Sequence, residues 1–312
     1  MALECTTRGR VGSGMAVRGI MVVRDEGDII GQVLGHLLTW LDALYIYDTG
    51  SGDGTWEIVR EVARQDRRVV ALGSEPVVFH NGVRAMVFDR VRERFREGDW
   101  VARLDADEIY HGAPAEFLRE RVERGEGRVF AQLYEFLITK REAAAWERGE
   151  ETLADRARPI EERRRRYVVQ AFPEPRLFRY RRSMRWPPGS YVPLCGGVVA
   201  RERMPVRHYR WRDPVQAAAR CAVRMEQRRG LVGAHWDLED WREWLANDED
   251  PRLLTWEPGM ELPEPGLTNH LPRGWRGVAA RAVYGTGLVR VVDRVMPRFP
   301  AGWRPEARVV TA

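Results

Sequence analysis

The chain has 312 residues, of which 51 are Lys or Arg and 46 are Asp or Glu, so its formal net charge is +5. This length accommodates one α/β catalytic domain with a C-terminal extension, and the positive surplus suits phosphate-bearing small molecules, membrane surfaces and nucleic acid about equally. The three cysteines (Cys5, Cys195 and Cys221) lack the spacing of a zinc site or a disulfide framework, and no apolar stretch approaches the roughly 18 residues of a membrane span. We therefore expect a cytoplasmic protein, soluble or peripheral at the inner face of a membrane.

Strands and helices alternate through the first hundred residues. Strand-like apolar runs cover Val17–Val23, Ala43–Tyr47, Arg68–Leu72 and a segment that ends at Asp105. Between them, apolar side chains recur at helical spacing over 29–41, about 56–63, and 83–95. This order predicts a largely parallel sheet with right-handed crossovers, in which ligands gather at the carboxyl ends of the strands.

Three unusual loops leave strands at that same edge. They cover residues 24–28, 48–55 and 105–108. In the first, Asp25 or Asp28 can cap the following helix. Unrelated surface turns would not all need to lie at one edge of the sheet. The shared position of the three loops therefore predicts one functional site.

The third loop places Asp105, Asp107 and Glu108 at the end of a buried strand. Buried charge needs a partner that offsets its desolvation. With the two-residue period of an extended chain, Asp105 and Asp107 would face the same hard cation and, through it, a diphosphate. The alternative is a solvated acidic turn.

The pattern changes after Glu108. Further strands are expected at Arg128–Ile138, Arg176–Tyr180 and Gly197–Arg201, with a charged stretch that is helical or mobile over 141–166. The four-arginine run Arg163–Arg166 is interpreted as a solvated face. From Val215 onward the chain is expected to be mostly helical.

Four motifs occur in a fixed order: Val23–Glu26 (Val-Arg-Asp-Glu), Tyr47–Thr55 (Tyr-Asp-Thr-Gly-Ser-Gly-Asp-Gly-Thr), Leu104–Glu108 (Leu-Asp-Ala-Asp-Glu) and His208–Trp211 (His-Tyr-Arg-Trp). This ordered set resembles the family 2-like glycosyltransferases, which have the GT-A nucleotide-sugar fold. The resemblance covers residues 17–215. It implies an α/β domain of GT-A type over 15–215, with a Rossmann-like, mostly parallel sheet flanked by helices, and a mostly helical extension over 216–312.

The resemblance also implies a donor site in the first loops. Asp48, with Glu26 nearby, would accept hydrogen bonds from a nucleotide base or ribose. Asp53 either joins them or only holds its Gly-Asp-Gly turn. Arg84 either faces the diphosphate or is an exposed helical arginine.

A metal site follows from the same resemblance. Asp105 and Asp107 match the family's metal and ribose contacts, and Glu108 would bind the acceptor or support the loop. His208 is the candidate late ligand of Mn²⁺ or Mg²⁺, because neutral imidazole can complete a divalent-metal shell; a purely structural histidine is the alternative. The implied substrates are a nucleoside diphosphate sugar and a hydroxyl acceptor.

The resemblance further implies inversion at the anomeric carbon, which needs a carboxylate base that deprotonates the acceptor hydroxyl. Glu135, Glu174 and Glu202 all lie in the second half of the chain, where the acceptor side is expected. Glu174 is preferred, because the prolines on both sides of it would fix its loop. Donor sugar, nucleotide base and acceptor are not specified by the sequence.

Other functions fit less well. Asp48-Thr49-Gly50 looks like an aspartic protease tripeptide, but that class pairs two such loops in an all-β fold. An EF-hand fails because Gly50 and Gly52 stand where oxygen ligands are required. A non-enzymatic Arg-rich binder of nucleic acid or anionic lipid would carry few organised carboxylates, so we expect no nucleic-acid partner.

The C-terminal segment 275–312 alternates apolar side chains with arginines. At helical spacing this is typical of a basic amphipathic segment, which can contact an anionic membrane or pack on the catalytic domain.

Overall fold

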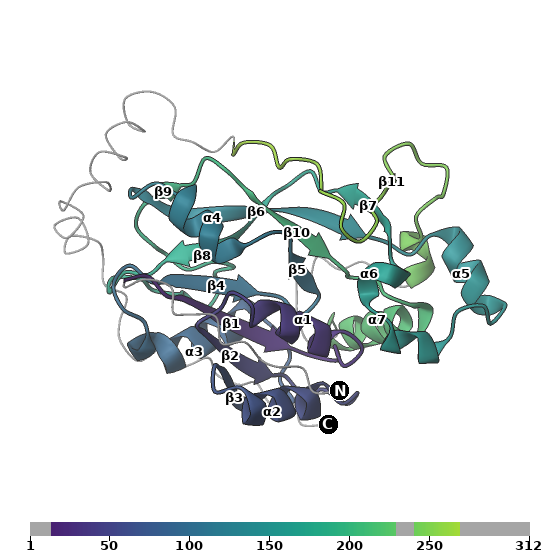
Figure 1. Cartoon of the computed structure of the whole chain (residues 1–312). Helices are drawn as coiled ribbons and strands as arrows, with labels where there is room; N and C mark the ends of the chain where they lie inside the picture. The colour runs from purple at the N-terminus through teal and green to yellow at the C-terminus, as the bar shows by residue number, and fades with distance from the viewer. Residues whose placement is uncertain (1–13, 229–239, 269–312) are drawn as a thin grey trace, which may run out of the picture.

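The computed structural model describes residues 14–228 and 240–268 (Figure 1). The strands are β1 (Val17–Val23), β2 (Ala43–Asp48), β3 (Val69–Ser74), β4 (Trp100–Leu104), β5 (Glu108–Tyr110), β6 (Glu126–Phe136), β7 (Arg166–Val169), β8 (Glu174–Arg179), β9 (Val198–Val199), β10 (Met204–His208) and β11 (Leu254–Thr255). The helices are α1 (Ile30–Leu37), α2 (Thr55–Gln65), α3 (Asn81–Val91), α4 (Pro114–Glu120), α5 (Lys140–Glu147), α6 (Ile160–Arg163) and α7 (Pro214–Arg228), with 3-10 turns η1 (Arg92–Arg94), η2 (Leu153–Ala157) and η3 (Trp241–Trp244).

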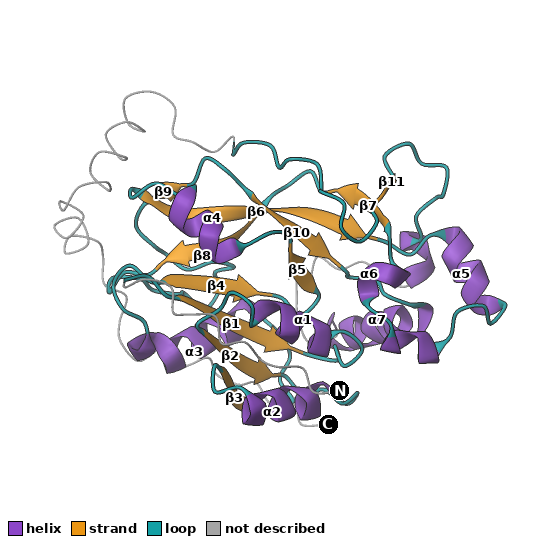
Figure 2. Cartoon of the chain, viewed as in Figure 1, coloured by secondary structure: helices purple, strands orange, loops and turns teal. Residues whose placement is uncertain are grey.

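The strands form one sheet in the order β11-β7-β6-β8-β4-β1-β2-β3. β3, β2, β1 and β4 run parallel to one another, as the alternation predicts. β8 is antiparallel to both β4 and β6. The expected α/β class is confirmed, with the correction that the sheet is parallel only in its N-terminal half and mixed beyond β4 (Figure 2).

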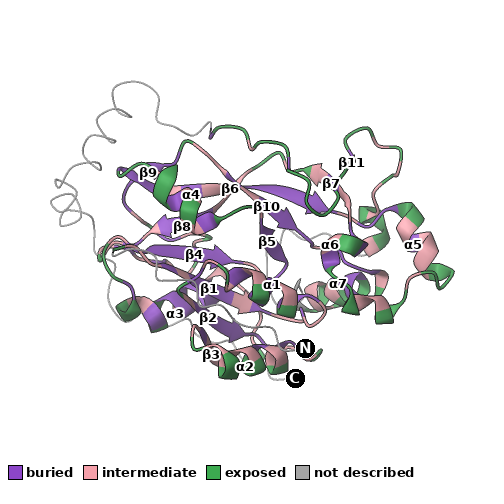
Figure 3. Ribbon diagram, viewed as in Figure 1, coloured by how far each residue is buried: buried purple, intermediate pink, exposed green. Residues whose placement is uncertain are grey.

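Helices cover both faces of the parallel half. Side chains of β1 alternate, so Met21 packs with α1 residues such as Val33, while Ile20 packs with α3 residues such as Val87. A parallel sheet covered in this way is buried on both faces, and its strands are therefore nearly continuous apolar runs. Figure 3 shows the result: the central strands are buried, and exposed residues lie on the outer sides of helices such as α2 and α5.

The described part of the C-terminal region differs from the expectation. α7 is helical as predicted, but residues 240–268 contain only the turn η3 and the short strand β11. β11 pairs with β7, and Trp256 packs edge-on against Phe136 with ring centroids 5.9 Å apart. This segment is therefore extended along the sheet because its apolar side chains complete the core. The division at residue 216 stays a prediction, and the segment 275–312 lies outside the described residues.

No helix within 14–228 or 240–268 has the length and apolar character that a membrane crossing requires.

The interpretation of Arg163–Arg166 as a solvated face is wrong for Arg163 and Arg164, whereas Arg165 and Arg166 are partly exposed. Arg163 and Arg164 are 6% and 1% exposed. The Glu151 carboxylate accepts hydrogen bonds from Arg164 at 2.9 and 3.0 Å and from Arg163 at 3.3 Å, and Arg163 also pairs with Asp213 at 3.3 Å. Arg163 and Arg164 face inward because Glu151 and the buried Asp213 compensate their charges, and a charge run alone does not reveal such partners.

We predict that Glu151→Ala lowers the free energy of unfolding by about 3–5 kcal/mol, because it leaves the buried Arg164 guanidinium without its carboxylate and Arg163 with Asp213 alone. Chemical denaturation measures this. The matched control is Glu150→Ala, whose carboxylate pairs only with the exposed Arg148 and whose loss should change stability little. Equal effects of the two substitutions would contradict a buried network.

Candidate active site

The loops after β1 and β2 are tied together by hydrogen bonds. The two strands end side by side, with Val23 opposite Asp48. Asp25 has a left-handed backbone (φ 53°); its amide donates to Ser51 Oγ at 2.9 Å, and its carboxylate accepts from the Gly52 amide at 2.8 Å. The expected capping of the next helix is wrong, because α1 has no side-chain cap and its two candidate aspartates are engaged elsewhere.

Asp48 and Asp53 both hold these loops. Asp48 is fully buried, and its carboxylate accepts hydrogen bonds from the Gly50 and Ser51 amides and from two serine hydroxyls. Asp53 accepts from the Gly27 amide at 2.8 Å and from the amide and hydroxyl of Thr55. For Asp53 this geometry matches the loop-holding alternative. The predicted contact of Asp48 with a nucleotide stays a prediction.

The carboxylates after β4 lie in a turn. The Glu108 amide donates to the Asp105 carbonyl at 3.4 Å, and β5 begins at once. The chain is not extended between Asp105 and Asp107, so the two-residue period does not apply. The Asp105 carboxylate forms ion pairs with Arg84 at 2.5 Å and with Arg176 at 3.2 Å.

Asp107 instead meets His208. β10 runs between β5 and β6, with His208 opposite both Glu108 and Glu135. His208 Nε2 lies 3.4 Å from Asp107 Oδ1, and His208 Nδ1 lies 2.9 Å from Glu135 Oε1. The imidazole thus lies between two carboxylates. The structure brings His208 to the acidic turn, as the order of the motifs predicts.

Burial and charge act in opposite directions on this pair. Burial alone would lower the pKa of His208, but the Glu135 and Asp107 carboxylates outweigh it and raise that pKa well above its usual value. Burial alone would raise the pKa of Asp107, but His208 and Arg220 hold it well below its usual value. Without a bound metal, the two groups form an ion pair.

We tested whether these residues fit a divalent metal. Among residues 14–228 and 240–268, no three His, Cys, Asp or Glu side chains are placed to hold an ion together, because Asp105 turns to its arginines. Asp107 and His208 do fit. Two ligands at about 2.1–2.2 Å from one ion lie about 3 Å apart when adjacent, close to the 3.4 Å observed. Asp107 Oδ2 is buried without a hydrogen bond from the described residues.

A second group of charges joins the first loop to α7. Arg212, which is fully buried, binds Asp28 through two hydrogen bonds of 2.7 and 2.8 Å and Glu26 through one of 2.7 Å. Arg220 lies 2.9 Å from Asp107 and 3.5 Å from Glu26. Burial raises the pKa of Glu26 to about 7, although Arg212 and Arg220 oppose the change.

The third group surrounds Glu174. Its carboxylate is bound by Arg103 at 3.0 Å, by Arg176 at 2.8 Å and by the Tyr191 hydroxyl. The Arg103 guanidinium also stacks on the Tyr191 ring, 3.8 Å from its centroid. Arg176 also donates two hydrogen bonds to the buried Glu108 carboxylate. Glu174 keeps about a quarter of its side-chain surface exposed, so its carboxylate is held in place yet accessible.

The remaining predicted residues are placed as follows. Arg84 is buried, with its guanidinium 4.9 Å from the Phe79 ring, so it is not an exposed helical arginine. Glu202 pairs with Arg121 at the surface, before β10 begins, whereas His208 ends that strand. Glu202 is therefore not brought to the acidic turn.

Asp28, Arg176, Arg212 and Arg220 were missed by sequence reasoning. The available signal was that buried carboxylates require cations. This signal does not identify which residues supply the cations, because nearly every basic residue of this chain is an arginine and Lys140 is the only lysine.

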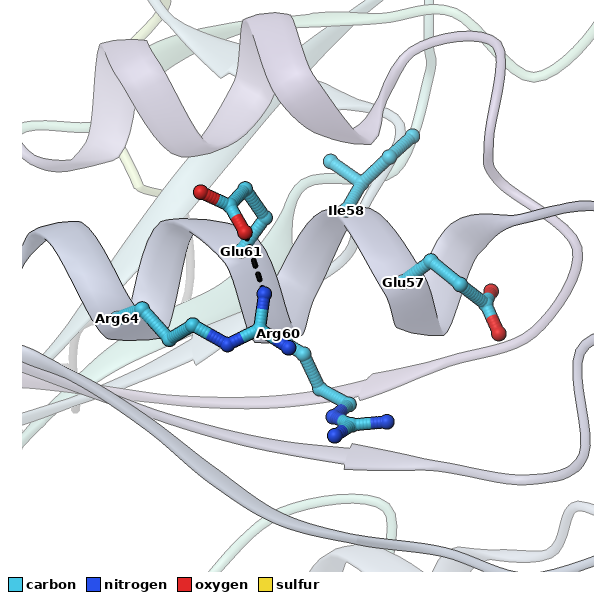
Figure 4. Close-up of a pocket in the computed structure, with 5 residues that line it drawn as sticks. All are labelled: Glu57, Ile58, Arg60, Glu61 and Arg64. Atoms are coloured by element: carbon cyan, nitrogen blue, oxygen red, sulfur yellow. Dashed lines mark hydrogen bonds and ion pairs between the residues drawn. The ribbon is translucent and has the colours of Figure 1, made fainter.

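A separate open pocket lies on the outer side of α2 (Figure 4). It is lined by Glu57, Ile58, Arg60, Glu61 and Arg64. All five residues come from one helix, and none belongs to the predicted site.

Comparison with known proteins gives likenesses in structure only. No protein-family model matches the chain, and no curated protein matches it. A mannosyltransferase from Pyrobaculum calidifontis, solved with GDP-Man and Mn²⁺, is 15% identical over 53% of this chain and 44% of its own, with a TM-score of 0.30. TarS (residues 1–349) from S. aureus is 13% identical over 68% and 65%, with a TM-score of 0.32. These likenesses concern the α/β fold alone.

A third solved structure has different chemistry. The CTP:phosphocholine cytidylyltransferase of Streptococcus pneumoniae is 10% identical over 52% of this chain and 68% of its own, with a TM-score of 0.25. The region of the Pyrobaculum calidifontis mannosyltransferase that matches this chain is less than half of that protein's length. At such low scores the chemistry of the site is taken from this chain's own residues.

We predict that Asp53→Ala lowers the free energy of unfolding by about 2–4 kcal/mol, because three loop hydrogen bonds of about 1 kcal/mol each are lost, and leaves nucleoside diphosphate affinity unchanged. Denaturation and calorimetric titration with GDP and UDP measure the two quantities. Weaker nucleotide binding at unchanged stability would instead place Asp53 against the donor.

Proposed function

We propose that this protein is a metal-dependent, inverting glycosyltransferase that moves a sugar from a nucleoside diphosphate to a hydroxyl acceptor. The observation that supports it most directly is the row Asp107, His208 and Glu135 at the carboxyl edge of the sheet. Ligands of open α/β sheets bind at this edge. The first two loops, tied to each other by Asp25 and Asp53, would frame the nucleotide beside it.

Glu135 suits the role of orienting His208. A histidine that binds a metal through one ring nitrogen usually donates the other N–H to a carboxylate, which fixes the ring and its tautomer. Glu135 Oε1 lies 2.9 Å from His208 Nδ1, so Nε2 is the nitrogen directed at Asp107. Asp107 and His208 would hold Mn²⁺ or Mg²⁺, and Asp105 is proposed to contact the donor from the other side of the turn.

The bound ion would neutralise charge that develops on the diphosphate leaving group. The protein adds its own cations around that position. Arg84 and Arg176 flank Asp105, and Arg220 flanks Asp107. A guanidinium binds phosphate oxygens in pairs, so these arginines would orient the diphosphate while the edge of the sheet fixes its place.

Glu174 is the proposed base. Of the three candidates, Glu135 is engaged with His208 and Glu202 lies at the other end of β10, whereas Glu174 is adjacent to the Asp105 group through Arg176. Arg103 and Tyr191 fix its carboxylate, and its exposed quarter would face the acceptor hydroxyl.

The Arg-rich binder of nucleic acid or lipid is less well supported. Its arginines should lie on the surface, but Arg164, Arg176 and Arg212 are at most 2% exposed and paired with carboxylates. Membrane contact through 275–312 remains a separate proposal for residues outside the described part.

We predict that Asp107→Asn lowers sugar transfer at least about 100-fold, because it removes the charge that would hold the metal. EDTA should abolish turnover of the parent, and Mn²⁺ should restore it. Release of nucleoside diphosphate from a panel beginning with GDP-mannose is the measurement, and Asp250→Asn, which removes a partly exposed carboxylate paired with Arg252, is the control. Full activity of the variant together with indifference to EDTA would remove the metal from the mechanism; release of pyrophosphate would indicate nucleotidyl transfer.

We predict that Glu174→Gln lowers turnover about 10²–10⁴-fold, as expected for loss of a general base, while nucleoside diphosphate affinity stays the same. Glu202→Gln, at the surface, should retain full turnover. Steady-state kinetics with the active donor separates the two. If Glu174→Gln is fully active, the base is another group and Glu135 is tested next.

A further inference from the structure

Arg220 makes the contact that a divalent metal would need. Its Nη1 lies 2.9 Å from Asp107 Oδ2 and 3.5 Å from Glu26 Oε1. His208 occupies the other oxygen, Oδ1, of the same carboxylate. In the structure, both oxygens of Asp107 are therefore contacted by the protein itself, and a metal ion must compete with a guanidinium for Oδ2.

Arg220 is the replaceable member of this group. Its side chain is 21% exposed, against 0% for Arg212 and 3% for Asp107. Its guanidinium donates two long hydrogen bonds, to the Arg210 carbonyl at 3.2 Å and to Glu26 Oε1 at 3.5 Å, and pairs with Asp107 Oδ2 at 2.9 Å. Arg212 instead donates four hydrogen bonds from its guanidinium and is fixed.

The start of α7 does not depend on Arg220 for its position. Asp213 pairs with Arg156 at 2.8 Å and Arg163 at 3.3 Å, and the Gln216 side chain bonds to the Arg212 amide at 3.1 Å. A role confined to anchoring the helix would duplicate these contacts. The placement of Arg220 over Asp107 calls for another explanation.

Charge balance supplies one. A divalent ion that approaches Asp107 alone meets the Arg220 guanidinium 2.9 Å from Oδ2 and the charge of Arg212 beside it, and like charges in a partly buried site repel strongly. A diphosphate brings negative charge and paired oxygen acceptors that suit a guanidinium. With both present, the metal takes the carboxylate and the arginine takes the phosphate.

We propose that Arg220 occupies the metal's place on Asp107 until a nucleoside diphosphate arrives, and then transfers to the diphosphate, so that metal and donor bind cooperatively. The proposal rests on the proposed function. It makes Arg220 a donor-positioning residue that also prevents the site from filling with metal alone.

Calorimetric titration of the full chain with Mn²⁺, with and without saturating GDP or UDP, tests the proposal. In the parent, the nucleoside diphosphate should tighten Mn²⁺ binding at least about tenfold, within the usual range of coupling between sites. Arg220→Gln should bind Mn²⁺ alone at least about tenfold more tightly and lose most of that coupling. Arg220→Lys, which keeps the charge, should resemble the parent.

The matched control is Arg156→Gln, which removes the same charge from an ion pair at the start of α7 and should leave Mn²⁺ affinity and coupling unchanged. Unaltered Mn²⁺ affinity in Arg220→Gln overturns the proposal. If circular dichroism shows that Arg220→Gln does not fold, the coupling measured in the parent protein tests the proposal instead. A nucleoside diphosphate that changes Mn²⁺ affinity of the parent less than twofold also overturns the proposal. Sugar transfer without coupling rejects this inference alone, whereas absence of both nucleotide binding and transfer rejects the proposed function as well.

Discussion

The site depends on the placement of buried carboxylates at the carboxyl edge of the sheet. Glu26, Asp107 and Glu108 are each less than a tenth exposed, and a buried charge without a partner is strongly destabilising. The fold supplies partners from distant parts of the chain: His208 from β10, Arg176 from β8 and a pair of arginines from α7 and the residues before it. The later elements therefore cannot move from the edge without leaving charges uncompensated.

This constraint explains why the second half of the sheet is mixed. β10 must run parallel to β6 to bring His208 beside Glu135, and β8 must run antiparallel to β4 to carry Arg176 toward Glu108. The same groups serve two purposes. With no ligand present they neutralise one another, and with a donor bound they are the groups that would contact metal, diphosphate and acceptor.

The sequence predicted what depends on local pattern. Val17–Val23 is a strand with the expected limits, because a strand covered on both faces is apolar throughout. The position of His208 beside the acidic turn was also predicted. Prediction failed where residues distant in the sequence determine the local conformation or burial. The chain turns at Asp105 instead of remaining extended. Arg163 and Arg164 face inward because Glu151 pairs with both. An abundance of arginine conceals which ones are buried, so Arg212 and Arg220 carried no signal of their own.

The strand β11 has a consequence for how the protein is made. It covers the outer edge of β7, from which it is separated by almost ninety residues of chain, with Leu254 opposite Tyr167. An uncovered strand edge offers unpaired backbone groups to other chains, and contacts between distant residues form late in folding. During synthesis the edge of β7 stays open, and the Phe136 ring lacks Trp256, until the ribosome has passed residue 256. For that interval the nascent chain leaves the edge of β7 unpaired in addition to the edge strand β3, and unpaired strand edges make incomplete chains prone to aggregation.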